Sequence, residues 1–298
     1  MPLQIVHHPD YDAGFAVNHR FPMSKYPLLM EALRARGLAG ALNIAERALA
    51  SWLKLAHGSD YVDQVVTCAV PEKIEREIGF PVGPRVSLRA QLATGGTVLA
   101  ARLALGHGIA CNTAGGSHHA RRAQGAGFCT FNDVAVASLV LLAEGAAQNI
   151  LVVDLDVHQG DGTADILADD PRVFTFSMHG DRNYPARKIA SDLDIALPDG
   201  TGDAAYIERL AAILPELSAR AHWDIVFYNA GVDVHAQDRL GRLSLSNDGL
   251  RARDETVIGH FRALGIPVCG VIGGGYSTDV RALAARHAIL FEAASGYA

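Results

Sequence analysis

Short apolar runs alternate with longer helical patterns along the whole chain, and this alternation narrows the possible folds more than any other feature. Ile150–Asp154 (ILVVD), Ile225–Asn229 (IVFYN) and Val268–Ile272 (VCGVI) are almost continuously apolar. Such runs are typical of strands that are buried on both faces of a parallel sheet. Because helical patterns separate them, the sequence predicts a single α/β domain with a mostly parallel sheet over residues 1–298.

The apolar runs and the helical periodicity also give approximate boundaries for the elements. Strands are predicted at Leu3–Val6, Ile109–Asn112, Ile150–Asp154, Val173–Ser177, Asp192–Leu197, Ile225–Asn229 and Val268–Ile272. Helices are predicted at Lys25–Arg36, Ile44–Leu55, Leu88–Leu105, Asn132–Glu144, Tyr206–Ala219, Asp248–Leu264 and Thr278–Phe291.

Composition limits the classes of function. The chain has 298 residues, of which 49% are hydrophobic, so it can bury a large core. Its 26 basic and 32 acidic residues give a net charge of −6, which disfavours direct binding to DNA or RNA and favours a basic substrate tail. No apolar run approaches the ~20 residues that a membrane-spanning helix needs.

The cysteines and the first residues bear on the cellular compartment. No CxxC pair is present, and we expect reduced thiols of a cytoplasmic protein. The start of the chain, MPLQIVHHPDYD, lacks the basic and apolar segments of a signal peptide. The four cysteines are Cys68, Cys111, Cys129 and Cys269, and all but Cys68 lie in apolar or glycine-rich stretches.

Unusual polar residues gather where predicted strands end. Four predicted strands, Ile109–Asn112, Ile150–Asp154, Ile225–Asn229 and Val268–Ile272, end in such residues. In the same order, they lead into His118 and His119, into Asp154–Asp161, into Asp233 and into Tyr276. Ligands bind at the carboxyl ends of strands in open parallel α/β sheets. The sequence therefore predicts a functional site at this edge of the sheet.

The stretch around Asp156 suggests a metal site. Asp154, Asp156 and His158 would point the same way in an extended segment, and Asp233 arrives from another strand. Asp156, His158 and Asp233 would leave one coordination position open, as catalytic metal sites do. These nitrogen and oxygen ligands suit Zn²⁺, Fe²⁺ or Mn²⁺. The alternative is that these residues are only helix caps and turn residues.

Two further groups fit a hydrolytic site. A divalent ion lowers the pKa of a bound water to about 7, and an adjacent imidazole such as His118 or His119 can accept a proton. Tyr276 follows three glycines, and its hydroxyl could stabilise an oxyanion. Each of these residues could instead be an ordinary buried side chain.

Five motifs carry a family resemblance. AGGSHHA, GAGFCTFND, DLDVHQGDG, NAGVD and GGGY follow one another in this order. Together they resemble the histone deacetylase superfamily, and the likeness runs from the region of His7 almost to the end of the chain. The segment YNAGVDVHAQDRLGRLSLS, together with Asn183-Tyr184-Pro185 and Thr94–Thr97, is most similar to class IV deacetylases and their bacterial relatives.

The resemblance implies a fold and a cofactor. It implies an arginase/deacetylase-like α/β sheet of about eight strands, within the usual size of open sheets, and Zn²⁺-dependent hydrolysis of acyl-lysine. Asp156, His158 and Asp233 would be the metal ligands. A structural K⁺ would lie beside Asp154 and Ser177.

The resemblance also implies catalytic roles. His118 would pair with Asp154, and His119 with Asp161. His119 would be the main general base and acid, while His118 assists electrostatically. Tyr276 would stabilise the oxyanion.

The same resemblance implies the walls of an acyl-lysine channel. Gly127 and Phe128 would form one wall, with Tyr184 opposite Phe128 and Leu240 nearby. Phe80–Pro84 would border the entrance, or form an ordinary proline turn.

Alternatives remain open at this stage. The substrate could be an acylated lysine of a protein or peptide, or a small acylated amine such as an acetylpolyamine. A binuclear arginase-like hydrolase would need further carboxylates near Asp233, and a non-catalytic acyl-lysine binding module would usually have lost one of these groups. Arg121 and Arg122 are either surface charges or contacts to an acidic group near the mouth. Acyl length, native metal and oligomeric state are not fixed.

Overall fold

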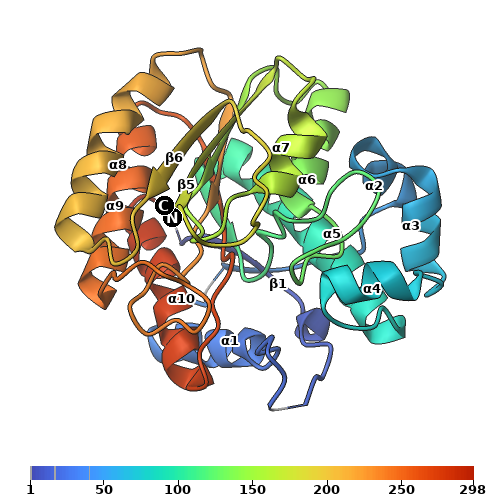
Figure 1. The fold of residues 1–298 in the computed structure, drawn as a ribbon. Coiled ribbons are helices and arrows are strands. Elements are labelled where there is room, and N and C mark those ends of the chain that lie inside the picture. Colours follow the sequence, from blue (N-terminus) through green and yellow to red (C-terminus); the bar gives the residue numbers. More distant parts are fainter. Residues whose placement is uncertain (1, 17, 40) are drawn as a thin grey trace.

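The computed structural model describes residues 2–16, 18–39 and 41–298, and an eight-stranded sheet lies at its centre (Figure 1). Every pairing in the sheet is parallel, and the strand order is β2-β1-β3-β8-β7-β4-β5-β6. The strands are β1 (Gln4–His7), β2 (Ala41–Ile44), β3 (Ile109–Asn112), β4 (Ile150–Asp154), β5 (Val173–Gly180), β6 (Leu193–Leu197), β7 (Ile225–Asn229) and β8 (Val268–Val271).

The burial of each strand follows its place in the sheet. Every residue of β3, β4, β7 and β8 is buried, which explains why their sequences are continuously apolar. The edge strands β2 and β6 alternate between more and less exposed residues. The predicted mostly parallel α/β sheet is thus confirmed, whereas the extent of a single domain over residues 1–298 stays a prediction.

Helices cover both faces of the sheet (Figure 1). One layer contains α5 and α6, with α2 and α7 packed against α6; the other contains α1, α8, α9 and α10. The helices are α1 (Lys25–Ala35), α2 (Ala50–Ala56), α3 (Ser59–Val66), α4 (Glu72–Ile78), α5 (Pro84–His107), α6 (Asp133–Ala143), α7 (Asp161–Leu167), α8 (Asp203–Ser218), α9 (Asn247–Ala263) and α10 (Val280–Ser295), with a 3₁₀ turn at Pro9–Tyr11. No helix among these described residues is long and apolar enough to cross a membrane.

One predicted element is wrong. The helix expected at Ile44–Leu55 is instead the end of β2, an extended connection and the short helix α2. Ala41–Ile44 pairs in parallel with β1, so backbone hydrogen bonding to a neighbouring strand overrides the local helical pattern. The short helices α3, α4 and α7 were not predicted either.

Of the cysteines, Cys68 is exposed and the other three are buried, and all are free thiols.

A buried arginine on α9 connects the helical layer to the strand ends that form the site. The side chain of Arg253 is fully buried, and Nη1 donates to the carbonyl of Gly231, 2.5 Å away, just after β7. Its Nε donates to Asp254 Oδ1 at 2.9 Å, and the same oxygen accepts the hydroxyl of Tyr228. Removing the guanidinium would therefore leave a buried carboxylate without its countercharge.

We expect Arg253→Met to lower the free energy of unfolding by about 3–5 kcal/mol, because breaking a buried ion pair leaves one charge uncompensated. Arg251→Met on the same helix is the matched control. Arg251 pairs with Glu292 at the surface, and such pairs contribute at most about 1 kcal/mol. Urea denaturation of both variants measures the difference, and equal small losses would contradict the assigned role of Arg253.

Candidate metal-dependent active site

Four neighbouring strands deliver the polar residues of the site. β3, β8, β7 and β4 are consecutive in the sheet, and all run in the same direction. The loops that follow them therefore meet at one edge, as the sequence predicted. This edge carries His118, Asp156, Asp233 and Tyr276.

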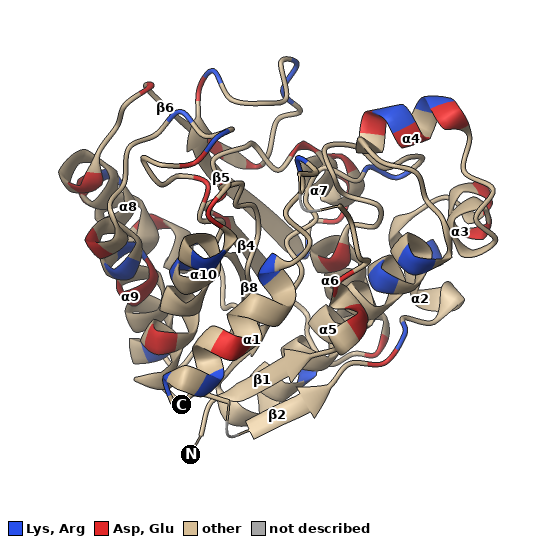
Figure 2. Cartoon of the chain, turned by 90° about the horizontal axis from the view of Figure 1, so that it is seen from below, with Lys and Arg blue, Asp and Glu red and all other residues tan. Residues whose placement is uncertain are grey.

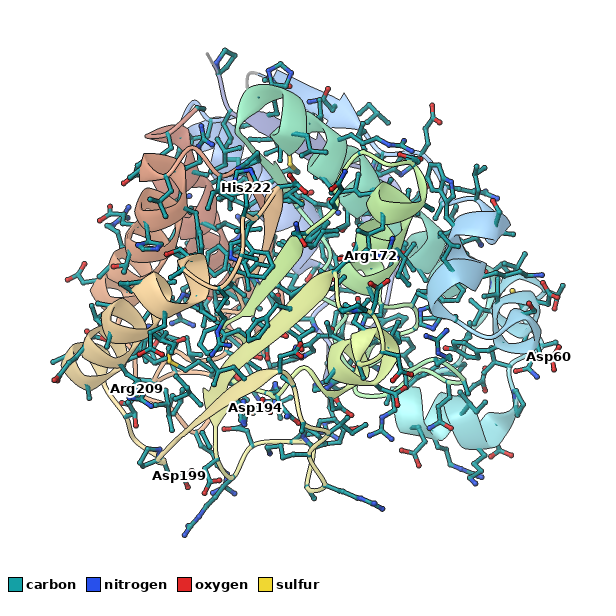
Figure 3. The ribbon with its side chains drawn as sticks, turned by 90° about the horizontal axis from the view of Figure 1, so that it is seen from above. Asp60, Arg172, Asp194, Asp199, Arg209 and His222 are labelled. Atoms are coloured by element: carbon teal, nitrogen blue, oxygen red, sulfur yellow. The ribbon has the colours of Figure 1, made fainter. Side chains whose placement is uncertain are left out.

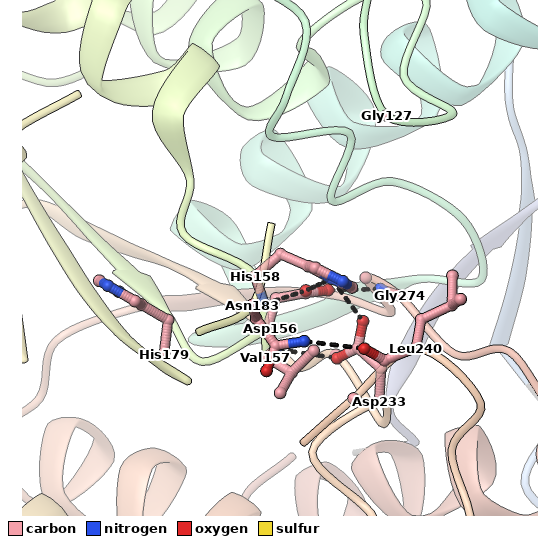
Figure 4. A network of polar contacts seen from close by, with 12 residues as sticks. Gly127, Asp156, Val157, His158, His179, Asn183, Asp233, Leu240 and Gly274 are labelled. Atoms are coloured by element: carbon pink, nitrogen blue, oxygen red, sulfur yellow. Dashed lines mark hydrogen bonds and ion pairs between the residues drawn. The ribbon is translucent and has the colours of Figure 1, made fainter. Parts of the chain in front are cut away.

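Two carboxylates and one imidazole converge on a single point in these loops (Figure 4). Ligand atoms of Asp156, His158 and Asp233 all lie within 4.8 Å of one another, and all three residues are buried. His158 Nδ1 lies 3.0 Å from Asp156 Oδ1 and 3.2 Å from Asp233 Oδ2. Asp154 is not part of this group, because its carboxylate faces His118 instead.

The glycines around this group allow the chain to pack against the carboxylates. A Cβ at Gly274 would lie 2.0 Å from Asp233 Oδ2 and 2.7 Å from Asp156 Oδ2. The amide of Gly274 instead donates to Asp156 Oδ2 at 2.7 Å, and the amide of Val157 donates to Asp233 Oδ1 at 2.9 Å. The glycines of the GGGY segment are thus explained by close approach.

The two carboxylates of this group influence each other's ionisation. Burial raises the pKa of Asp233, and the neighbouring Asp156 carboxylate raises it further, to about 7. Burial opposes ionisation of Asp156 as well, but His118 and His158 hold its pKa well below the usual range. Asp233 Oδ2 accepts no hydrogen bond from any described residue. A buried oxygen of this kind, beside a second carboxylate, is suited to a bound cation.

The tandem histidines have different environments. His118 Nδ1 lies 2.6 Å from Asp154 Oδ2, and His119 Nδ1 lies 2.6 Å from Asp161 Oδ1. Burial opposes the charge on His118, but the carboxylates of Asp154 and Asp156 outweigh it and raise its pKa to about 9. Burial and the charge of His118 lower the pKa of His119 to about 3. The pair therefore holds one charged and one neutral imidazole.

Tyr276 lines the same cavity as the histidines and contacts the Asp–His–Asp group. Its backbone amide donates to Asp238 Oδ2 at 2.7 Å, and its ring packs edge-on to His158 with the centroids 6.1 Å apart. Burial, together with the charges of Asp156 and Asp233, raises the pKa of its hydroxyl well above the usual value. The hydroxyl therefore keeps its proton and can donate a hydrogen bond.

A channel leads from the surface to this group. The cavity, of about 410 Å³, is lined by all four predicted wall residues, Gly127, Phe128, Tyr184 and Leu240. Phe128 has a left-handed backbone with φ of 67°, and its amide donates to the carbonyl of Ile78 at the end of α4. The unpredicted helix α4 thus supports one wall of the channel.

The predicted border of the entrance at Phe80–Pro84 is misplaced. Phe80 is buried, and its ring stacks on Phe128 with the centroids 6.2 Å apart. Pro84 begins α5. The residues that reach the mouth are instead Arg76–Gly79, one turn earlier in the chain.

Comparisons with known proteins agree with this geometry. The histone deacetylase domain model matches residues 19–291. The chain belongs to the histone deacetylase family. Histone deacetylase 2 of Arabidopsis thaliana is 31% identical over 92% of this chain and 74% of its own length. An uncharacterized protein of Picosynechococcus is 47% identical over 99% of both chains.

The solved structure of another protein has the same architecture as this histone deacetylase family member. The HDA15 HD domain has a TM-score of 0.84 and 22% sequence identity, and the match covers 100% of this chain and 89% of that one. The arginase/deacetylase-like fold is thus confirmed. The narrower resemblance to class IV enzymes stays a prediction.

Two basic residues contact the site: the sequence left the role of Arg121 open between a surface charge and a contact to an acidic group, and it did not indicate Lys25. Arg121 Nη2 lies 2.6 Å from Asp161 Oδ2, so the carboxylate that holds His119 also holds this guanidinium. Lys25, at the start of α1, is buried, and its Nζ donates to the carbonyl of Gly273 at 3.3 Å. The tandem arginines were a visible signal for Arg121, but nothing in the local sequence pattern indicates the burial of Lys25.

His57 lies outside the site and holds the segment that follows His118 and His119. Its Nε2 accepts the amide of Asn132 at 3.0 Å, so Nδ1 carries the proton and donates to the carbonyl of Arg121 at 2.9 Å. Burial lowers the pKa of His57 to about 4. Protonation of Nε2 would break the bond to Asn132, and the fold therefore depends on a neutral His57.

We expect this dependence to appear in stability. In the unfolded chain His57 has the ordinary histidine pKa of 6.5 and binds a proton below it, whereas in the folded chain it does so only near pH 4. The free energy of unfolding therefore falls as the pH falls through this window, by up to about 3 kcal/mol. His57→Gln, which keeps an acceptor for Asn132, should lose less stability between pH 6.5 and 4 than the wild type.

The control for this experiment is His222→Gln, at an exposed histidine labelled in Figure 3. It should follow the wild-type pH profile. Denaturant unfolding at each pH gives the comparison. Parallel profiles for wild type and His57→Gln would show that His57 does not titrate in this way.

Proposed function

We propose that the protein is a metal-dependent deacylase that hydrolyses the amide of an acylated lysine side chain. The observation that carries the proposal is an imidazole bonded to a carboxylate beside a buried Asp–His–Asp group, at the end of a channel. His119 is that imidazole, and it lines the channel together with Tyr276. Membership of the histone deacetylase family supports hydrolysis of an acylated substrate.

The residues of the buried group fit a divalent ion. Asp156, His158 and Asp233 would hold it, and Asp233 Oδ2, which accepts no hydrogen bond from any described residue, supports this assignment. The ion would polarise the amide carbonyl and lower the pKa of the attacking water. The donor set suits Zn²⁺ and also accepts Fe²⁺. The register of β4 and β5 places Asp154 beside Ser177, where we propose a structural K⁺.

The two histidines divide the proton transfers. His119 would take a proton from the attacking water as the new carbon–oxygen bond forms, and it would return that proton to the lysine nitrogen as the carbon–nitrogen bond breaks. Asp161 orients its ring through the bond to Nδ1. His118, charged through Asp154, would stabilise negative charge next to the reacting carbon.

Tyr276 would stabilise the oxyanion that forms on the carbonyl oxygen. Its hydroxyl is protonated, and its backbone is fixed by Asp238. Phe128 and Tyr184 would enclose the methylene chain of the lysine between their rings, with Gly127 and Leu240 completing the walls. A Cβ at Gly127 would lie 2.5 Å from the ring of His119, so this position must lack a side chain.

We expect the purified, metal-loaded protein to release acyl groups from lysine peptides, and to stop when the metal is chelated. Tyr276→Phe should lower kcat by about 10²–10³-fold, as loss of one oxyanion donor does. Tyr297→Phe, at an exposed tyrosine, is the matched control and should leave kcat unchanged. Turnover by Tyr276→Phe at the wild-type rate would contradict the mechanism.

The same assay addresses the alternatives. Peptides with acetyl, butyryl, octanoyl and myristoyl groups report the acyl length that the channel accepts. Release only from acetylpolyamines would identify the protein as a small-amine deacetylase. Full metal occupancy with no turnover of any acyl substrate would favour a non-catalytic binding module.

A further inference from the structure

The mouth of the channel is lined by more positive than negative side chains. Arg20, Arg76, Arg182 and Arg242 line it, and Glu77 is the acidic residue among them. The whole chain carries a net charge of −6, so the mouth differs in sign from the molecule. In Figure 2, basic segments (blue) lie on the loops near β5 and β6, whereas α4 carries both basic (blue) and acidic (red) segments.

Some of these arginines have acidic partners, but the partners do not neutralise them all. Arg242 Nη1 lies 3.1 Å from Asp199 Oδ2, and Arg182 Nη1 lies 3.9 Å from the same oxygen. Asp199, labelled in Figure 3, is thus shared by two guanidinium groups. The pair between Arg76 and Glu72 is exposed on both sides and therefore weak.

Arg20 has no ion-pair partner among the described residues, and it lies directly on the channel wall. Its guanidinium carbon is 5.9 Å from the centroid of the Phe128 ring, within the range of a cation–π contact. Phe128 is one of the two aromatic walls of the channel. A substrate group that meets Arg20 is therefore next to the acyl-lysine itself.

A second hollow continues the positive surface past Tyr276. It has a volume of about 430 Å³, shares Arg20 with the mouth, and adds Arg239. The amide of Arg239 donates to the carbonyl of Tyr276 at 3.1 Å, and its side chain forms no ion pair with any described residue. The other residues that line this hollow include no carboxylate, and among them are the polar side chains of Asn18, Ser277 and Thr278.

We propose that the protein selects acylated lysines that lie beside carboxylate groups. The planar guanidinium fork matches a carboxylate in bidentate geometry, and Arg20 and Arg239 offer two such forks that form no ion pair with any described residue. This inference rests on the proposed deacylase function. It reverses the sequence-based expectation that an acidic chain attracts a lysine-rich tail, because the local charge at the mouth decides the encounter.

The test compares peptides that share one central acyl-lysine and differ only in the flanking residues, which are glutamate, glutamine or lysine. We expect kcat/KM to fall in that order, with about tenfold between the glutamate and lysine peptides at low salt. The difference should shrink as salt is added, because exposed charges are screened.

Variants assign the preference to the two unpaired arginines. The double substitution Arg20→Gln and Arg239→Gln should bring the ratio of kcat/KM for the glutamate and glutamine peptides close to one. Arg209→Gln, at an exposed arginine on α8 that is labelled in Figure 3, is the matched control and should keep the wild-type ratio. Equal ratios in the double variant and the wild type would overturn the assignment.

A further pair of peptides separates the sources of the carboxylate. One ends in acyl-lysine with a free α-carboxylate and the other with an amide. Preference for the free acid alone points to a terminal carboxylate, and preference for flanking glutamate points to acidic side chains. Hydrolysis without either preference, or with preference for lysine flanks, overturns this inference and leaves the proposed function intact. No hydrolysis of any peptide overturns both.

Discussion

Two carboxylates buried at the ends of adjacent strands are the constraint on which the rest of the site depends. Asp156 follows β4 and Asp233 follows β7, and these strands pair directly. Two negative charges so close together resist ionisation, which is visible in the raised pKa of Asp233. Backbone amides donate hydrogen bonds to both carboxylates, and His158 lies beside them. Because Gly274 has no side chain, its backbone can approach them closely. A positive ion would complete this balance of charge.

His118 and His119 are adjacent in the sequence, but their pKa values shift in opposite directions. Their carboxylate bonds are equally short, yet His118 lies within 3.7 Å of Asp156 whereas His119 does not share that charge. His118 is therefore charged, and its charge helps to keep His119 neutral. Arg121 acts from outside by pairing with Asp161, and its charge helps to keep the pKa of that carboxyl low. A tandem sequence thus yields two residues of different character.

The sequence predicted the buried strands and the reactive residues at their ends, and it missed the elements whose conformation depends on contacts with distant parts of the chain. Buried strands were found because both of their faces are apolar, and strand-end residues were found because acids and histidines are unusual there. The edge strand β2 was missed because its four residues acquire their conformation only by pairing with β1. The mouth was missed for the same reason, since Arg20, Arg182 and Arg242 come from loops far apart in the chain.

The most direct test of the proposed metal site is the metal content of the purified protein, measured together with a variant at the Asp233 carboxylate. We expect one divalent ion per chain at the buried group in the wild type, and loss of that ion in Asp233→Asn without loss of the fold. Asp60→Asn, at an exposed acid, should keep it. If Asp233→Asn bound the same ion with the same affinity, the buried Asp156–His158–Asp233 group would not be the metal site.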